Sequence, residues 1–143
     1  MKRNDKRMTI EEIIENFEFL DDWDDRYKYL IELGDMLEPF PEELQNSDTK
    51  VNGCVSQVWI AAKTAEGPDP VIKYIGTSDA HIVRGLIAIT LAIFSGQHAE
   101  KILNTDEQEI FSQLGLSEHI TPQRSNGLRS MVTRMKEIAA NAA

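Results

Sequence analysis

The stretch from residue 80 to residue 95 constrains the fold of this 143-residue chain more than any other. Its apolar side chains cover most of the circumference of the helix that they predict, and a helix that is apolar nearly all round lies at the centre of a fold. Thr77, Ser78 and Asp79 offer caps for its start, and Gly96 offers the left-handed residue that often ends a helix. The rest of the chain must therefore pack around this helix.

Two amphipathic helices are predicted before it. The first begins after Thr9, where Thr9 and Glu12 can form a capping box, and it follows residues 1–8, which we expect to be a flexible tail. Aspartates between residues 21 and 25 end this helix and start the second, because they accept hydrogen bonds from free backbone N–H groups. The prolines that follow end the second helix, so the two helices are expected to be antiparallel.

A β-hairpin is predicted in the middle of the chain. Residues 38–52 are polar and show no periodicity, which indicates a long loop. Residues 55–62 and 71–76 are rich in β-branched and aromatic side chains and flank a Gly–Pro turn, as in an antiparallel hairpin. Residues 44–52 offer room for a third strand.

Shorter helices are predicted in the C-terminal part. A second capping box at Thr105 opens one that ends at Gly115, and the last helix begins at Thr121 with Pro122 in its first turn. Together the elements predict an α+β fold in which a small antiparallel β-sheet packs against several α-helices. We expect a single domain over residues 9–143.

The acidic charge argues against one large class of partners. Lys and Arg number 15 against 24 Asp and Glu, and a surface with a net charge of −9 repels the phosphate backbone of nucleic acids. The basic N-terminus leads into acidic residues rather than into the apolar stretch of a secretion signal. The longest apolar run, residues 86–94, is shorter than the ~20 residues that span a bilayer. We expect a soluble cytoplasmic protein that binds neither nucleic acid nor a membrane.

Cys54 is the only cysteine of the chain, so it cannot form an internal disulfide. A lone cysteine often acts as a small buried hydrophobe. Here Gly53 allows a positive φ just before it and a long loop leads up to it, which together favour an exposed turn. A thiolate is a nucleophile whose formation depends on nearby cations, and the sequence offers Lys50, Arg84, Arg124 and Arg129.

The sequence contains no conventional hydrolytic motif, neither a Gly-rich phosphate loop nor a serine nucleophile elbow. His81, His98 and His119 have no spacing that pairs them with a nucleophile or a metal, so surface or capping roles are expected for them.

Residues 124–128 are unusual for the first turns of a helix, because asparagine and glycine are poor helix formers. Two interpretations stay open at this point. The segment is either a loose start of the helix or a functional one, in which Arg124 points at the loop of Cys54.

The segment of residues 51–59 resembles the signature around the active cysteine of the SufE family, the sulfur-accepting partners of cysteine desulfurases. Further segments resemble that family in the same order, at residues 29–34, 78–88 and 116–128. The resemblance implies a small antiparallel sheet packed on helices, similar to the fold of IscU-type cluster scaffolds. It also implies a sulfur acceptor and activator of a cysteine desulfurase that uses pyridoxal phosphate.

In that role, the Cys54 thiolate attacks the persulfide of a SufS- or CsdA-type desulfurase and carries the sulfur to an iron–sulfur scaffold. No cofactor other than the transient persulfide on Cys54 is implied, and the chain is a sulfur-transfer partner rather than a self-contained enzyme. The resemblance further implies supporting or partner-binding roles for Gly53, Ser56, Gln57, Asp79, His81 and Arg124.

Family members shelter the cysteine beneath its loop, and Val51, Val55 and Trp59 are available for this here. The loop is then expected to open when the desulfurase binds. Val55 is a departure from the family pattern, because other members often carry a polar residue at this position.

The main alternative is an iron–sulfur scaffold or metal-binding protein of IscU-like fold, and a third interpretation is an adaptor in which Cys54 plays no part. The solitary cysteine argues against the scaffold, because a cluster needs about four protein ligands. The sequence leaves open whether the chain is of the SufE or the CsdE type, and it leaves the oligomeric state open, a homodimer included.

Overall fold

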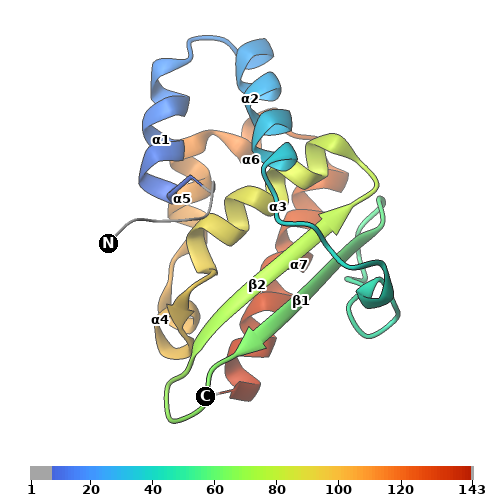
Figure 1. Cartoon of the computed structure of the whole chain (residues 1–143). Coiled ribbons are helices and arrows are strands. Elements are labelled where there is room, and N and C mark those ends of the chain that lie inside the picture. Colours follow the sequence, from blue (N-terminus) through green and yellow to red (C-terminus); the bar gives the residue numbers. More distant parts are fainter. Residues whose placement is uncertain (1–7, 143) are drawn as a thin grey trace.

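The computed structural model describes residues 8–142. Its elements follow one another as α1 (Ile10–Phe19), α2 (Trp23–Asp35), the 3-10 turn η1 (Glu42–Leu44), β1 (Val58–Thr64), β2 (Val71–Ser78), α3 (His81–Phe94), β3 (Gln97–His98), α4 (Ala99–Asn104), α5 (Glu107–Leu114), α6 (Leu116–His119) and α7 (Pro122–Ala142). A small antiparallel sheet packed against helices confirms the α+β fold (Figure 1). Of the tail expected at residues 1–8, residues 1–7 lie outside the described residues, and Met8 packs partly against the core.

Helix α3 lies at the centre of the fold, as its apolar sequence predicts. Most of its side chains are buried, and it packs against α1, α2, α7 and β2. Gly85 permits a close crossing with α2, because a Cβ atom there would lie 2.2 Å from the carbonyl oxygen of Leu30. Gly96, with φ +82°, follows the last residues of the helix as predicted.

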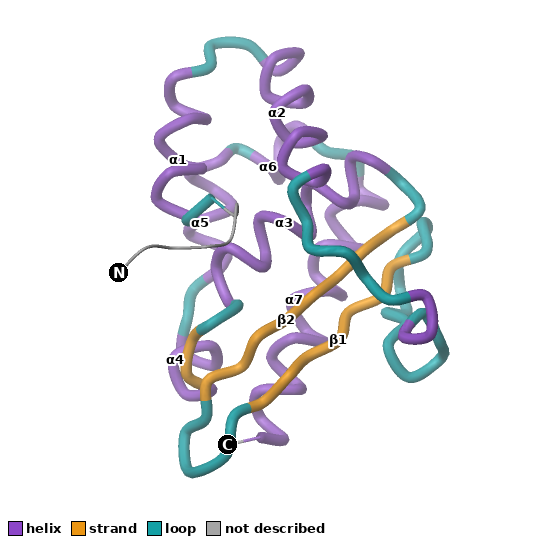
Figure 2. The backbone as a smooth tube through the Cα atoms, in the orientation of Figure 1, coloured by secondary structure: helices purple, strands orange, loops and turns teal. Residues whose placement is uncertain are grey.

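The sheet consists of three antiparallel strands in the order β1-β2-β3. Strands β1 and β2 form the expected hairpin, in a register that places Val58 opposite Ser78. Helix α7 runs along this hairpin on the side away from the viewer in Figure 2. The buried hydroxyl of Tyr74 in β2 donates to the carbonyl of Met135, 2.7 Å away, and so ties the sheet to α7.

The third strand does not lie where it was expected. It is β3, directly after α3, whereas residues 44–52 contribute only an isolated bridge between Lys50 and Trp59. Asn46 explains the difference, because its side-chain oxygen accepts hydrogen bonds from the N–H groups two and three residues later. The segment therefore curls into a turn instead of extending along the sheet.

The predicted caps are confirmed at the helices that begin the chain and at the last helix. Thr9 and Glu12 form the reciprocal capping box of α1, at 3.1 and 2.8 Å. Asp22 caps α2 by accepting from the N–H of Asp25. Thr121 caps α7 in the same way, so helix α7 has a defined start and the loose-start interpretation is wrong.

The predicted caps of α5 and α3 are wrong. Asp106 caps α5, because the hydroxyl of Thr105 donates back to the carbonyl of Lys101 and closes α4. Helix α3 has no side-chain cap on its first N–H groups. Asp79, expected to be one, accepts instead from the N–H of Gln57 in the loop before β1. This exchange joins the start of α3 to the loop of Cys54.

Candidate functional site

Cys54 lies in a loop, residues 50–57, which includes the residues at 55–57 that the sequence assigned to a strand. Gly53 has φ +92°, a backbone conformation that favours glycine. A Cβ atom on Gly53 would also lie 2.6 Å from the hydroxyl oxygen of Ser130 on α7. Both the turn and the close approach to α7 therefore require glycine before the cysteine.

Backbone contacts fix both ends of this loop. At its start, the N–H of Val51 donates to the carbonyl of Val58 at 2.8 Å, and the Val51 side chain is buried. At its end, the N–H of Gln57 donates to the Asp79 carboxylate at 3.1 Å, and the N–H of Asp79 donates to the Gln57 carbonyl at 3.3 Å. The segment that carries the cysteine is thus held at both ends, by the contact of Val51 with Val58 and by the contacts of Gln57 with Asp79.

The thiol of Cys54 packs against the first turns of α7. Its sulfur lies 3.7 Å from the carbonyl oxygen of Gly127, to which the S–H can donate a weak hydrogen bond. A Cβ atom on Gly127 would lie 3.5 Å from the same sulfur. Gly127 is a site residue that was not predicted. The signal that points to it is a glycine early in a helix, where glycine is a poor helix former.

A hollow of about 370 Å³ adjoins the thiol. The loop, α3 and α7 contribute its walls, and Arg124 is the one charged side chain among its lining residues, which are Cys54, Val55, Ser56, Val83, Leu86, Thr121, Gln123, Arg124, Gly127 and Met131. The interpretation in which Arg124 approaches the reactive loop is therefore supported by its position in the fold.

Burial raises the pKa of the Cys54 thiol above its ordinary value. Of the four cations that the sequence offered, Arg84 pairs with Asp35 at 3.5 Å, and neither Lys50 nor Arg129 lines the hollow. Arg124 is the one of the four that lines the hollow, and the raised pKa favours the protonated thiol, which is a poor nucleophile.

Val55 does not shelter the cysteine, contrary to expectation. Its side chain is 82% exposed, whereas Val51 is buried and Trp59 is partly buried. The chain bends directly after Cys54, so the Cys54 sulfur lies beside Gly127 while Val55 is left exposed. An exposed apolar side chain therefore lies next to Cys54 in the loop.

The remaining predicted site residues are placed as follows. Ser56 lines the hollow, and Gln57 and Asp79 form the anchor at the end of the loop. His81 is exposed in the first turn of α3, two residues after Asp79, and it does not line the hollow. Ser56, Gln57 and Asp79 are thus part of the loop or of its anchor, and His81 is not among the residues that line the thiol hollow.

His98 and His119 have local roles, as expected. The Nδ1 atom of His98 lies 2.8 Å from the carbonyl oxygen of Asp69. The ring of His119 stacks on Trp23 at 4.1 Å between centroids, and its Nδ1 atom lies 3.0 Å from the Gly115 carbonyl.

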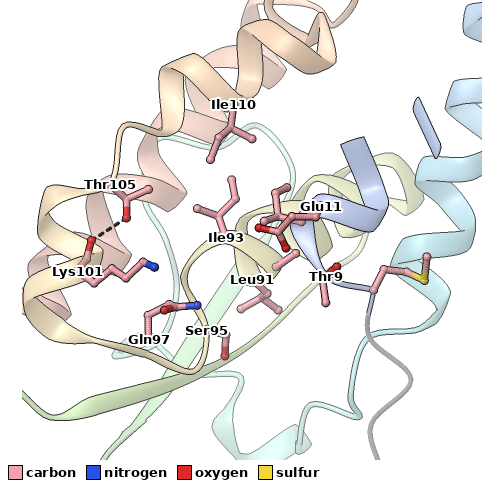
Figure 3. A pocket seen from close by; sticks show the side chains of 12 residues that line it. Thr9, Glu11, Leu91, Ile93, Ser95, Gln97, Lys101, Thr105 and Ile110 are labelled. Carbon is pink, nitrogen blue, oxygen red and sulfur yellow. Dashed lines mark hydrogen bonds between the residues drawn. The ribbon is translucent and has the colours of Figure 1, made fainter. Parts of the chain in front are cut away.

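A second hollow, of about 330 Å³, shares no lining residue with the first (Figure 3). It lies among α1, the end of α3 and α4, and its walls combine apolar side chains such as Leu91 and Ile110 with Thr9, Glu11 and Lys101. Across residues 8–142, no His, Cys, Asp or Glu side chains gather in a group that could hold a metal ion. No helix in the same range is long and apolar enough to cross a membrane.

Two curated relatives are similar to the chain over most of its length. Both are SufE-like proteins described as uncharacterized. The one from Rhizobium meliloti (strain 1021) is 52% identical over 132 residues, covering 92% of this chain and 94% of the relative. The one from Rhizobium etli is also 52% identical over 132 residues, covering 92% of this chain and 89% of the relative.

A solved structure shares the fold. It is the solution structure of a hypothetical protein from Thermus thermophilus, with a TM-score of 0.73 and 21% sequence identity, and the match covers 94% of this chain and 98% of that one. The sequence model of SufE, described as an Fe-S metabolism associated domain, matches residues 11–139. The resemblance read from the sequence is confirmed, and the chain belongs to the SufE family of Fe–S metabolism proteins.

Proposed function

We propose that this protein accepts sulfur on Cys54 from the persulfide of a SufS- or CsdA-type cysteine desulfurase, and so activates that enzyme. The observation that carries the proposal is a single thiol beside an open hollow, with no histidine among the described residues that line it, in a chain of the SufE family. The sulfur then passes to an iron–sulfur scaffold in the cytoplasm. The same proposal treats residues 9–143 as one functional domain.

The transfer needs only one thiol on this chain. The Cys54 thiolate attacks the terminal sulfur of the desulfurase persulfide and forms a new S–S bond, while the S–S bond within the desulfurase breaks. The desulfurase cysteine leaves as a thiolate, so no external oxidant or reductant is required. A second cysteine nearby would resolve the persulfide and release sulfide, and the sequence has none.

The loop must move for this attack to occur. In the described state burial raises the pKa of the Cys54 thiol, which leaves little thiolate at neutral pH. Release of the anchors at Val51 or Gln57 would bring the sulfur into water and towards the incoming persulfide. Gly53 supplies the turn for this movement, and Ser56 and Arg124 line the space that the sulfur leaves.

The partner is expected to dock on the face that surrounds this loop. Val55 offers an exposed apolar contact beside the sulfur, Asp79 holds the end of the loop through Gln57, and His81 is exposed in the first turn of α3. Docking that competes with the Asp79–Gln57 contact would couple binding to the exposure of the thiol.

Intact-mass measurement tests the proposal. The full chain is incubated with a pyridoxal-phosphate cysteine desulfurase and L-cysteine and then measured under non-reducing conditions. The native protein should gain the mass of one sulfur atom, and Cys54→Ala should gain none. His98→Ala should still gain it, because His98 contacts Asp69 and lies outside the loop of Cys54 and the hollow beside it. Absence of the gain from the native protein under conditions in which the desulfurase itself carries persulfide would contradict the proposal.

A further inference from the structure

Arg134 on α7 reaches the segment that leads into the loop of Cys54. One terminal nitrogen of its guanidinium donates to the carbonyl of Asp48 at 3.2 Å, and the other donates to the carbonyl of Lys50 at 2.8 Å. A guanidinium presents its donors as a rigid fork, so one side chain can hold two neighbouring carbonyls at a fixed spacing. These contacts join residues more than 80 positions apart in the chain.

The same side of α7 meets the loop at two further places. The Gly127 carbonyl faces the sulfur of Cys54, and the Ser130 hydroxyl stands against Gly53. Residues 127, 130 and 134 are spaced by three and four positions, so they form one stripe along the helix. The loop therefore runs along α7 in the opposite direction, with Cys54 at Gly127, Gly53 at Ser130, and Lys50 at Arg134.

We propose that Arg134 is a positioning residue for Cys54, holding the start of the loop on α7 so that the sulfur stays beside Gly127. Loss of this contact leaves the start of the loop, opposite to the Asp79–Gln57 anchor, held by the backbone bonds of Thr49 and Val51 and by the buried Val51 side chain, and so loosens it. The inference deepens the proposed function, because it names a residue that regulates how readily the sulfur acceptor is exposed.

Arg134 is not among the residues that line the thiol hollow. It lines a different hollow, together with Asn52, Ser130 and Arg129. The groups that face the thiol hollow are neutral on α3, and on α7 only Arg124 is charged. A change in thiol reactivity on replacing Arg134 therefore reports the position of the loop.

Alkylation of the free full-length protein provides the test. Arg134→Met keeps most of the side-chain length but removes both donors, and Arg134→Lys keeps the charge without the fork. Arg129→Met is the matched control, because Arg129 is an exposed arginine of α7 that makes no hydrogen bond or ion pair with a described residue. Iodoacetamide rates are measured from about pH 7 to about pH 10, where thiols ionise, together with hydrogen exchange of residues 50–57.

Arg134→Met should react about tenfold faster than the native protein, which corresponds to about 1.4 kcal/mol of loop-holding free energy. The pH at which its alkylation rate increases should be lower than for the native protein, because an exposed thiol ionises more readily. The amides of the loop should exchange faster, while those of α3 should exchange as in the native protein. Arg134→Lys should fall between the two, and Arg129→Met should match the native protein.

Equal alkylation rates for Arg134→Met and the native protein would overturn the inference. An acceleration by Arg129→Met as large as that by Arg134→Met would also overturn it, because the effect would then be due to the lost charge alone. If Arg134→Met does not fold, the decision rests on Arg134→Lys, for which an unchanged rate counts against the inference. These readouts need no desulfurase. If the loop results stand and sulfur transfer fails for the native protein, the proposed function is wrong and the positioning role of Arg134 remains.

Discussion

At the scale of single residues, the surroundings of Cys54 favour the form of the thiol that does not react. Burial raises its pKa, and the Gly127 carbonyl offers an acceptor for the proton rather than a charge that would stabilise the thiolate. Arg124 lines the same hollow and is the charged side chain among the residues that do so. The described state thus favours the protonated thiol, and the opening that we propose would expose it.

The raised pKa predicts a pH-dependent contribution of Cys54 to stability. The folded chain holds the thiol proton more tightly than the unfolded chain does, so the contribution is complete below the ordinary pKa of 9.0 and is lost as the pH rises through the folded-state value. Cys54→Ala lacks this dependence. Urea unfolding of both proteins is measured from about pH 8 to about pH 10. As the pH rises, the unfolding free energy of the native chain should fall relative to that of Cys54→Ala. A difference that stays constant over this range would contradict the prediction.

At the scale of elements, the loop of Cys54 is held by contacts from elements that are distant in sequence. Helix α7 supplies Arg134 and Gly127, and the turn between β2 and α3 supplies Asp79. Each contact is polar and near the surface, whereas the hairpin next to the loop is held by a continuous ladder and a buried face. The loop can therefore open while the sheet stays intact.

Asp79 provides a test of this independence. Asp79→Ala removes the acceptor for the Gln57 N–H, and alkylation of Cys54 should become about fivefold faster, as expected for the loss of one hydrogen bond at the surface. Asp79→Asn keeps a side-chain oxygen and should show a smaller increase. The circular dichroism spectrum should be unchanged in both. Identical rates for the native protein and Asp79→Ala would show that this contact does not hold the loop.

Elements that depend on local sequence could be predicted, and contacts between distant elements could not. The apolar circumference of α3, the capping box of Thr9 and the solitary Cys54 are visible in short windows of sequence. The role of Gly127 depends on how α7 crosses the loop, which no local pattern encodes. Asp79 was predicted as a helix cap because aspartate before a helix is typical of one, but a backbone N–H from the loop competes for its carboxylate.

At the scale of the whole molecule, the site depends on how closely α3 approaches its neighbours. Helix α3 contributes Val83 and Leu86 to the wall of the thiol hollow, and between them Gly85 faces the backbone of α2. The helix pair and the site are thus built on opposite sides of the same turn of α3. Separation of α2 from α3 would shift the hollow as well as weaken the core.

Two glycine substitutions test the packing of α2 against α3 and the packing of Cys54 against α7 separately, because they are expected to change the unfolding free energy in opposite directions. Gly85→Ala would place a Cβ atom 2.2 Å from the Leu30 carbonyl oxygen, so two backbones must part, and we expect a loss of about 3 kcal/mol or more in unfolding free energy. Gly127→Ala places its methyl group 3.5 Å from the Cys54 sulfur, an ordinary contact, and in a helix this change should add about 0.5–1 kcal/mol. Urea unfolding measures both. A stable Gly85→Ala protein would mean that α2 and α3 can pack farther apart without cost. A destabilised Gly127→Ala protein would mean that the loop does not move to make room for the added methyl group. The packing of Cys54 against α7 would then be more rigid than the weak contacts of the loop indicate.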